Sequence, residues 1–333
     1  MRAPAFWAGP RPSLVARALQ PIGALYGAIA ARRMALSGAR VGVPVICVGN
    51  FVVGGGGKTP AALSLARLLI EMGERVAFVS RGYGGAVSQQ VVEVDPSAHR
   101  AAQVGDEPLL LAQIAPCFVS ADRRVGALAA IAAGASVIIL DDGLQNPSLV
   151  KDLTFAMVDG EAGLGNGLCL PAGPLRAPLA AQLAQVAAVV IVGGAPADPS
   201  LFADKPVLTA RLIPQADVAA TLVGRRLLAF AGIARPEKFY ATLRAIGADV
   251  VAAASFDDHH PFSEAEIAGL QARAAREHLV LTTTQKDAAR LTPEQRRAVT
   301  ALPVTLAFDD APRIRAMLGE ASACRRGAPR AIP

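Results

Sequence analysis

The chain has 333 residues, of which 53% are apolar and 18% charged, so a largely disordered protein is excluded and more than one hydrophobic core is expected. The formal net charge of +6 is local, because residues 1–40 contain six Arg and no acidic residue, and the 27 Lys and Arg that remain of 33 balance 27 Asp and Glu. This distribution argues against a broad nucleic-acid-binding surface and favours a basic segment that meets an acidic surface.

Residues 1–40 form the first expected unit, a basic apolar helix over 13–36. Arg17, Pro21 and an Arg pair near the end interrupt its apolar run, which leaves it shorter than the about 20 apolar residues of a spanning helix. We therefore expect this helix to lie on a membrane surface rather than to cross the bilayer. The alternative is a soluble helix that packs on the protein core.

From residue 43 onward, short runs rich in β-branched residues alternate with helical stretches. This alternation predicts an α/β fold with a mostly parallel sheet and helices on both faces. A second alternating set begins after Gly224 and predicts a smaller α/β domain. The expected organisation is a nucleotide-binding domain at 41–222, an α/β domain at 223–323 that includes a strand at 304–308, and a tail at 324–333.

A glycine-rich loop follows the first expected strand and precedes a helix. It reads Gly49-Asn50-Phe51-Val52-Val53-Gly54-Gly55-Gly56-Gly57-Lys58-Thr59-Pro60. The backbone N–H groups of Gly54, Gly55, Gly56 and Gly57 can surround phosphate oxygens that side chains would obstruct. Lys58 is expected to reach the terminal phosphates, and the Thr59 hydroxyl to bind Mg²⁺, as in a P-loop NTPase. The strict pattern would place a glycine where Val52 stands, and a plain flexible turn is the alternative.

Two adjacent carboxylates are the candidates for the metal. Asp141 and Asp142 follow an apolar run at 137–140, which we expect to be a buried parallel strand. Ligands of open α/β sheets bind at the carboxyl ends of the strands, where a nucleotide site needs a carboxylate to anchor Mg²⁺. The alternative is a surface turn rich in Asp and Gly.

A base is expected on the acceptor side, because phosphoryl transfer to an alcohol benefits from a group that takes up the hydroxyl proton. His259 and His260 follow a strand of the second domain, where a cleft would face the first. A metal site at this pair lacks an evident third ligand. Asp106 and Glu107 open a helix, and by themselves they are expected to be dipole partners of its N-terminus. Arg81 is either a phosphate or acceptor contact or part of a turn.

Together these motifs resemble those of the tetraacyldisaccharide 4'-kinase family, the lipid A 4'-kinases of Gram-negative bacteria. The resemblance covers essentially the whole chain, with the motifs in the family's order. They are VGNFVVGGGGKTP, SRGYGG, VGDEP, ADRR, LDDGLQ, GNG followed by LPAGPLR, AGIARPEKFY, FDDHHPFS and TTTQKDAAR.

The resemblance implies a kinase that transfers the γ-phosphate of ATP, with Mg²⁺, to the 4'-hydroxyl of a tetraacylated glucosamine disaccharide 1-phosphate, the membrane-embedded precursor of lipid A. It implies a P-loop core with a smaller α/β domain and a basic apolar N-terminal helix. The expected location is peripheral, on the cytoplasmic face of the bacterial inner membrane. Neither a nucleic acid nor a protein partner is indicated.

The resemblance also assigns roles to single residues. It makes Lys58 and Thr59 the phosphate and metal residues, with Asp141 and Asp142 as the Walker B-like carboxylates. It pairs Asp106 with His259 as the dyad that activates the acceptor hydroxyl, in place of the dipole role inferred above. A carboxylate that orients an imidazole and stabilises its cationic form makes it a better base. Further expected phosphate or head-group contacts are Arg81 and Arg176.

Three positions depart from the usual family pattern. Asn146 stands where a His usually follows, Ala177 replaces the Glu of GPLRE, and Gln285 replaces the Glu of TEKD. We assign no site role to these positions. Two other functions remain as alternatives: a P-loop kinase or ligase of a soluble metabolite, and a nucleotide-switched maturation factor, which would have no need for the His pair.

Overall fold

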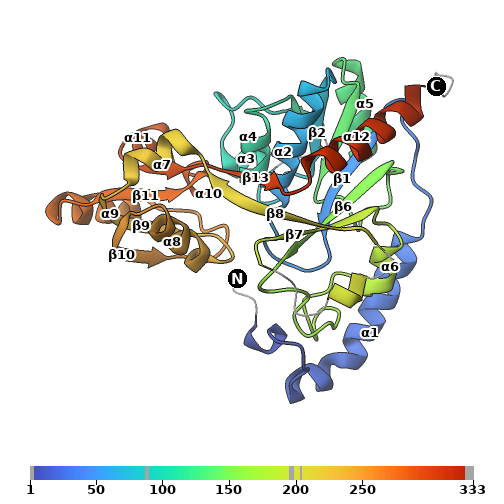
Figure 1. The fold of residues 1–333 in the computed structure, drawn as a ribbon, viewed down its shortest axis with the longest axis horizontal. Helices are drawn as coiled ribbons and strands as arrows, with labels where there is room; N and C mark the ends of the chain where they lie inside the picture. The colour runs from blue at the N-terminus through green and yellow to red at the C-terminus, as the bar shows by residue number, and fades with distance from the viewer. Residues whose placement is uncertain (1–3, 87–89, 195–198, 203–204, 327–333) are drawn as a thin grey trace.

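The computed structural model describes residues 4–86, 90–194, 199–202 and 205–326, and these form two β-sheets with helices around them (Figure 1). We call the part built on the larger sheet the large unit, and residues 216–302 the small unit. The small unit lies to one side, joined to the large unit by β8 and β13.

Within the described residues, the larger sheet has nine strands in the order β13-β8-β7-β6-β1-β5-β2-β4-β3. The pairs β13–β8 and β3–β4 are antiparallel and the other pairs are parallel. The strands are β1 (Val45–Asn50), β2 (Val76–Ser80), β3 (Val92–Glu93), β4 (Cys117–Val119), β5 (Val137–Asp141), β6 (Leu153–Asp159), β7 (Ala188–Val192), β8 (Val207–Pro214) and β13 (Val304–Phe308). The expected mostly parallel α/β sheet is confirmed.

Helices cover both faces of this sheet, as the fully buried strands β1, β2, β5 and β7 require. One face is covered by α2 (Lys58–Glu71), α3 (Ala101–Val104), α4 (Asp106–Leu111) and α12 (Ala311–Arg326). The other is covered by α5 (Arg123–Ala132) over β1, β2 and β5, and by α1 (Leu14–Met34) and α6 (Leu179–Leu183) near β6 and β7. The short helices η1 (Ala5–Trp7) and η2 (Pro199–Phe202) complete the large unit.

The small unit has its own parallel sheet, in the order β10-β9-β11-β12, and its own core. The strands are β9 (Arg226–Ala231), β10 (Asp249–Ser255), β11 (Val280–Thr284) and β12 (Thr300–Leu302). The helices are α7 (Ala216–Leu222), α8 (Pro236–Ala245), α9 (Glu264–Arg276), α10 (Gln285–Ala288) and α11 (Pro293–Arg297).

The expected boundaries of the second domain differ from this arrangement at both ends. The strand at 304–308 is β13, which pairs with β8 of the large sheet, and α12 packs on the large sheet as well. At the other end, Leu222 of α7 belongs to the core of the small unit, so that unit begins before residue 223. The chain thus leaves the large sheet through β8 and returns through β13, a pairing between distant segments that local patterns do not reveal. The expected tail also begins later, because α12 extends to Arg326, and residues 327–333 lie outside the described part.

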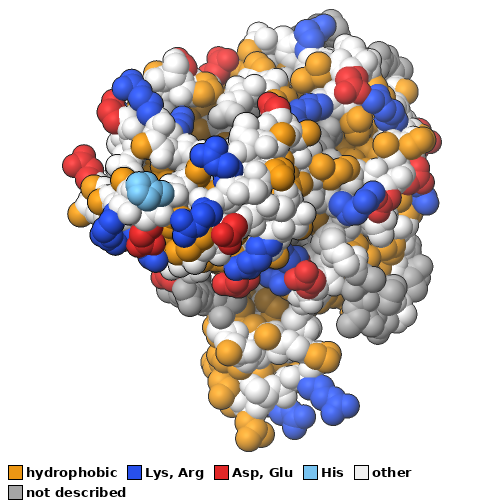
Figure 2. Space-filling model, turned by 60° about the vertical axis from the view of Figure 1, so that its left-hand side comes forward, with side chains coloured by type: hydrophobic (Ala, Val, Ile, Leu, Met, Phe, Trp, Pro, Cys, Tyr) orange, Lys and Arg blue, Asp and Glu red, His pale blue; other side chains and the backbone are white. Residues whose placement is uncertain are grey.

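Helix α1 runs without a break through Pro21, and Ser13 caps its first turn by accepting a hydrogen bond from the N–H of Ala16. By length and composition α1 could cross a membrane, since its most apolar stretch has a mean hydropathy of 1.3. A single helix of this kind near the N-terminus is only weak evidence for a membrane span. Its small residues Gly23 and Gly27 face Cys169 of the large unit, and most of its large apolar side chains are exposed, although Met34 at its end is buried. Figure 2 shows these apolar side chains on the segment that projects below the body, with Lys or Arg side chains near its end.

Candidate functional site

The glycine-rich loop connects the buried strand β1 to helix α2, which begins at Lys58. Gly54 and Gly57 have positive φ values of 113° and 79°, which residues with a side chain rarely adopt. The carbonyl oxygen of Gly54 accepts hydrogen bonds from Asn50 Nδ2 at 3.0 Å and from Lys58 Nζ at 3.3 Å. The loop thus ends at the N-terminus of a long helix, an arrangement that binds phosphate groups.

Val52, where the strict pattern has a glycine, lies in an extended stretch. It forms an antiparallel bridge with Leu175, and the N–H of Val53 donates to the carbonyl oxygen of Pro174 at 2.9 Å. A β-branched residue suits this conformation, so a glycine is not needed here. The bridge also brings in Arg176, whose Nε donates to the carbonyl oxygen of Val52 at 3.1 Å.

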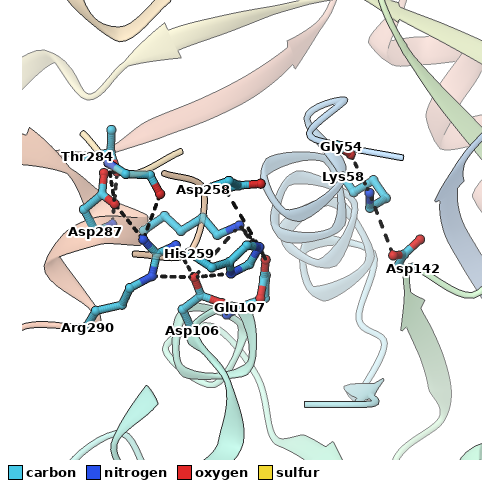
Figure 3. Close-up of polar contacts among 12 residues, drawn as sticks. Gly54, Lys58, Asp106, Glu107, Asp142, Asp258, His259, Thr284, Asp287 and Arg290 are labelled. Atoms are coloured by element: carbon cyan, nitrogen blue, oxygen red, sulfur yellow. Dashed lines mark hydrogen bonds and ion pairs between the residues drawn. The ribbon is translucent and has the colours of Figure 1, made fainter. Parts of the chain in front are cut away.

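The two expected metal carboxylates lie beside the loop, at the carboxyl end of β5. Lys58 Nζ lies 3.9 Å from Asp142 Oδ2, and Arg176 Nη1 lies 2.9 Å from both carboxylate oxygens of Asp142 (Figure 3 shows Lys58 and Asp142). The structure therefore brings Lys58, Asp141, Asp142 and Arg176 together. Arg176, expected to contact phosphate or the head group, is held by Asp142 in this state.

The two carboxylates have opposite electrostatic surroundings. Burial raises the pKa of Asp141 to about 6, the charge of Asp142 adds to this, and Lys58 opposes it. Burial acts on Asp142 too, but the charges of Lys58 and Arg176 hold the pKa of Asp142 below its ordinary value. Asp142 therefore carries a negative charge at neutral pH, whereas Asp141 gives up its proton only at about pH 6.

Asp141 has the free ligand atom that a metal site requires. Its Oδ1 is buried and has no hydrogen-bond partner among the described residues, and burial of an unpartnered carboxylate oxygen is costly. Thr59, in the first turn of α2, adds a hydroxyl, and Asp142 adds a second carboxylate, which Arg176 Nη1 holds in this structure and would have to share with the ion. Oxygen ligands of this kind are those that Mg²⁺ prefers, so these residues fit a magnesium ion.

Arg123 is a site residue that the sequence analysis did not select. Its guanidinium is buried, and Nη2 donates to the carbonyl oxygens of Asp142 at 2.7 Å and Asp141 at 3.4 Å. This contact holds the turn in which Asp142 adopts a positive φ of 53°. The ADRR motif was the available signal.

The expected dyad forms between the two units. Asp106 opens α4 of the large unit and is buried, while His259 follows β10 of the small unit with a positive φ of 59°. The Nδ1 atom of His259 lies 3.2 Å from Asp106 Oδ2 (Figure 3). The N–H of His259 donates to the carbonyl oxygen of Gly232, and the ring meets that of Tyr83 edge-on at 5.6 Å. The imidazole is thus held from both units.

His260 faces a different group. Its Nε2 lies 3.0 Å from Glu266 of α9, and its ring stacks on Phe256 at 4.8 Å. Glu266 is also the third residue of α9, and it forms the capping box of that helix with Ser263. The surroundings of His260 are therefore those of a structural residue of the small unit.

Three further charged residues surround the dyad, and the sequence analysis gave none of them a role there. Lys286 Nζ lies 2.7 Å from Glu107 Oε1 and 3.2 Å from His259 Nε2, and Arg290 Nη2 lies 2.5 Å from Asp106 Oδ2. Burial by itself would raise the pKa of Asp106, but hydrogen bonds with His259 and Glu107 and the charges of Lys286 and Arg290 hold that pKa well below its usual range. Burial, together with Asp106, raises the pKa of Glu107 to about 7. The available signals were the TTTQKDAAR motif, which contains Lys286 and Arg290, and the VGDEP motif, which contains Glu107.

Among the described residues, the metal site considered at His259 and His260 does not form, but the dyad and Glu107 make another group of possible metal ligands. Ligand atoms of Asp106, Glu107 and His259 lie within 4.8 Å of one another. However, the cations of Lys286 and Arg290 already neutralise both carboxylates at 2.7 Å and 2.5 Å. A divalent cation would have to displace these charges, so this group is better suited to proton transfer than to metal binding.

Arg81 follows β2 at the same edge of the large sheet. It is exposed, and it is close in sequence to Tyr83, whose ring meets that of His259. Burial lowers the pKa of Arg123, and the positive charge of Arg81 contributes to this lowering. The structure thus places Arg81 at the rim of the site.

Comparisons with known proteins agree with this arrangement. The family model described as "Tetraacyldisaccharide-1-P 4'-kinase" matches residues 15–322. The chain is 54% identical over 323 residues to a tetraacyldisaccharide 4'-kinase from Methylobacterium sp. (strain 4-46), covering 96% of this chain and 97% of the relative. It is 51% identical to the protein of that name from Nitrobacter winogradskyi, covering 96% and 97%.

A solved structure with a similar fold contains ATP. It is the "apo" form of LpxK from Aquifex aeolicus in complex with ATP, with a TM-score of 0.72 and 27% sequence identity. The match covers 93% of this chain and all of that chain.

Proposed function

The chain belongs to the tetraacyldisaccharide 4'-kinase family, and on this premise we propose that it transfers the γ-phosphate of ATP to the 4'-hydroxyl of the tetraacyl glucosamine disaccharide 1-phosphate precursor of lipid A. The observation that carries the proposal is the presence, at one edge of the large sheet, of a phosphate-binding loop and an imidazole paired with a carboxylate. A nucleotide switch would need the first, whereas a kinase of an alcohol needs both.

The nucleotide end of the proposed site is formed by the large unit. The N–H groups of the glycine-rich loop, Gly54–Gly57, and the ammonium of Lys58 would bind the phosphates. Thr59, Asp141 and Asp142 would hold Mg²⁺, which would supply positive charge to the phosphates. Asp141 is suited to this because its Oδ1 is otherwise unpartnered among the described residues.

The acceptor end is formed by both units. The 4'-oxygen attacks the γ-phosphorus as the bond from that phosphorus to the β–γ bridging oxygen breaks, and ADP leaves with the negative charge. The hydroxyl proton passes to His259 Nε2, the atom on the far side of the ring from Asp106. In the present state Lys286 Nζ lies 3.2 Å from Nε2, so the hydroxyl would take its place there while Lys286 keeps its contact with Glu107. Asp106 orients the ring and stabilises its cationic form.

The location proposed for the protein is the cytoplasmic face of the inner membrane. Leu14, Leu25 and Ile29 of α1 are 83%, 65% and 62% exposed, an arrangement that suits burial among acyl chains. The opposite side of α1 packs closely on the large unit through Gly23 and Gly27, so lipid would not surround the helix. We therefore propose a peripheral association that places the glycine-rich loop near a membrane-embedded substrate.

The test is a transfer assay with γ-labelled ATP, Mg²⁺ and the detergent-dispersed disaccharide monophosphate. The wild-type protein is expected to transfer label to the lipid, and Lys58→Ala to transfer none. Label released only as inorganic phosphate, or transferred equally well to a soluble sugar lacking acyl chains, would contradict the proposal.

A further inference from the structure

Arg290 joins the two units at the dyad. It lies just after α10 and is 7% exposed, and the Asp106 side chain is 3% exposed. Its Nε and Nη2 atoms donate to the same oxygen, Asp106 Oδ2, at 2.9 and 2.5 Å. This is the oxygen that lies 3.2 Å from His259 Nδ1. The guanidinium therefore holds in place the carboxylate oxygen of Asp106 that contacts the imidazole (Figure 3).

The small unit holds the guanidinium on its other side. Arg290 Nη1 donates to Asp287 Oδ1 at 2.8 Å and to the carbonyl oxygen of Gly232 at 2.9 Å. Asp287 is fully buried, and its two oxygens also accept the N–H of Gly232 at 3.1 Å and the hydroxyl of Thr284 at 2.7 Å. The planar guanidinium has donors in fixed directions, so this network leaves it little freedom.

The backbone gives the network a direct connection to the base. Gly232 accepts from Arg290 through its carbonyl oxygen, and the same oxygen accepts the N–H of His259 at 3.1 Å. Arg290 thus contacts the carboxylate of Asp106, which orients the imidazole. It also contacts the carbonyl oxygen of Gly232, which holds the backbone of His259. The other charged groups that face His259 are Glu107 and Asp258, each at 3.9 Å, and Lys286 at 3.2 Å.

We propose that Arg290, held by Asp287, is a positioning residue for phosphoryl transfer, and that it acts through Asp106 by fixing the carboxylate oxygen that orients His259. The inference rests on the proposed function, because it assigns a task within the same site. The N–H of Glu107 holds the other oxygen, Oδ1, at 3.1 Å, so without the guanidinium Oδ2 would lose its two close donors and be held less firmly toward the imidazole.

A double-mutant cycle tests this inference. The kcat for transfer of label to the lipid is measured for wild type, Arg290→Met, Asp106→Asn and the variant with both changes. Arg290→Met is expected to lower kcat by about 10- to 100-fold, the range typical of coupled groups in one network. Added to Asp106→Asn, it is expected to cause no further loss, because its effect passes through a carboxylate that is already gone.

Two further measurements separate positioning from a general structural role. The KM for ATP should stay unchanged in Arg290→Met, because the glycine-rich loop is formed elsewhere, and Arg290→Lys should recover part of the lost kcat. Arg297→Met, the same change at an exposed position of α11, serves as the matched control and should behave as wild type.

The outcomes are decisive in each direction. An unchanged kcat in folded Arg290→Met, or a loss that multiplies with that of Asp106→Asn, would overturn the inference. Should Arg290→Met fail to fold, the same cycle is measured with Arg290→Lys. A kcat below that of wild type that adds no further loss to Asp106→Asn supports the inference, and an unchanged kcat or a loss that multiplies overturns it. Absence of any transfer in the wild type would instead contradict the proposed function.

Discussion

The Nδ1 atom of His259 lies 3.2 Å from Oδ2 of Asp106, although the two residues belong to different units of the protein. The proposed base and the carboxylate that orients it therefore meet only while the small unit lies against the large one. The phosphate loop is close to the same junction, because a Cβ at Gly55 would lie 3.8 Å from that of Ala234 in the small unit. Transfer should thus depend on contacts that join the units.

The first prediction distinguishes the two adjacent histidines. His259→Ala should lower kcat by about 10² to 10⁴-fold, the usual contribution of a general base, with little change in ATP binding. His260→Ala should retain turnover but lose about 1–2 kcal/mol of folding free energy, because it removes the contacts with Phe256 and Glu266. Steady-state kinetics and thermal unfolding check both. The assignment is wrong if turnover survives in His259→Ala and fails in His260→Ala.

The second prediction concerns the loss of folding stability caused by ionisation of the buried Asp141. Asp141→Asn should abolish transfer and yet stabilise the metal-free protein at pH 8. The folded-state pKa of Asp141, about 6, lies above its ordinary value of 3.8, so ionisation destabilises the fold as pH rises through this window. The asparagine variant should therefore be more stable than wild type by up to about 3 kcal/mol above pH 6, and the difference should vanish near pH 4.

Denaturant unfolding in the presence of a chelator, at pH 4, 6 and 8, measures this difference. A stability gap that does not depend on pH would show that the effect has another cause.

The third prediction concerns ion pairs that join the units away from the dyad. Asp159, at the end of β6, lies 2.7 Å from both Arg235 Nη1 and Lys238 Nζ of the small unit. Asp159→Ala should lower kcat by roughly tenfold, because the small unit that bears His259 would be held less firmly. Asp309→Ala, which removes an ion pair with Arg211 on the large sheet, is the control. Equal kinetics in the two variants would refute the proposed link.

The fourth prediction concerns membrane association. Leu25→Glu and Ile29→Glu should each reduce binding to anionic liposomes by about tenfold or more, because burial of one such side chain contributes about 1.5–3 kcal/mol. ATP binding should not change, since α1 is separate from the glycine-rich loop. Val125→Glu, at an exposed apolar position of α5, is the matched control. Sedimentation with liposomes measures the bound fraction, and full binding by both α1 variants would exclude this face of the helix.

Much of the site could be predicted because its parts are local in sequence. Gly54–Gly57 lie between a strand and a helix, and Lys58 and Thr59 open that helix, so the expected phosphate chemistry follows from spacing alone. Asp141 could be located because it ends a buried strand. Asp106 shows the limit of such reasoning: by itself it was expected to be a dipole partner, and only the resemblance paired it with His259. Arg123, Lys286 and Arg290 lie in quoted motifs, yet nothing in their local pattern indicates what they contact.

The sequence by itself determined the α/β class, the glycine-rich loop between strand and helix, the two carboxylates at the end of β5 and the apolar, basic helix at the N-terminus. These features depend on hydrophobic periodicity and turn chemistry over a few residues, and such short patterns can be recognised in the sequence alone. Only the tertiary structure decided that β13 returns to the large sheet, that Val52 bridges to Leu175, and that Arg290 reaches Asp106 across the two units. Such contacts join segments far apart in the chain. They are decided by how the whole core packs, which no short stretch of sequence specifies.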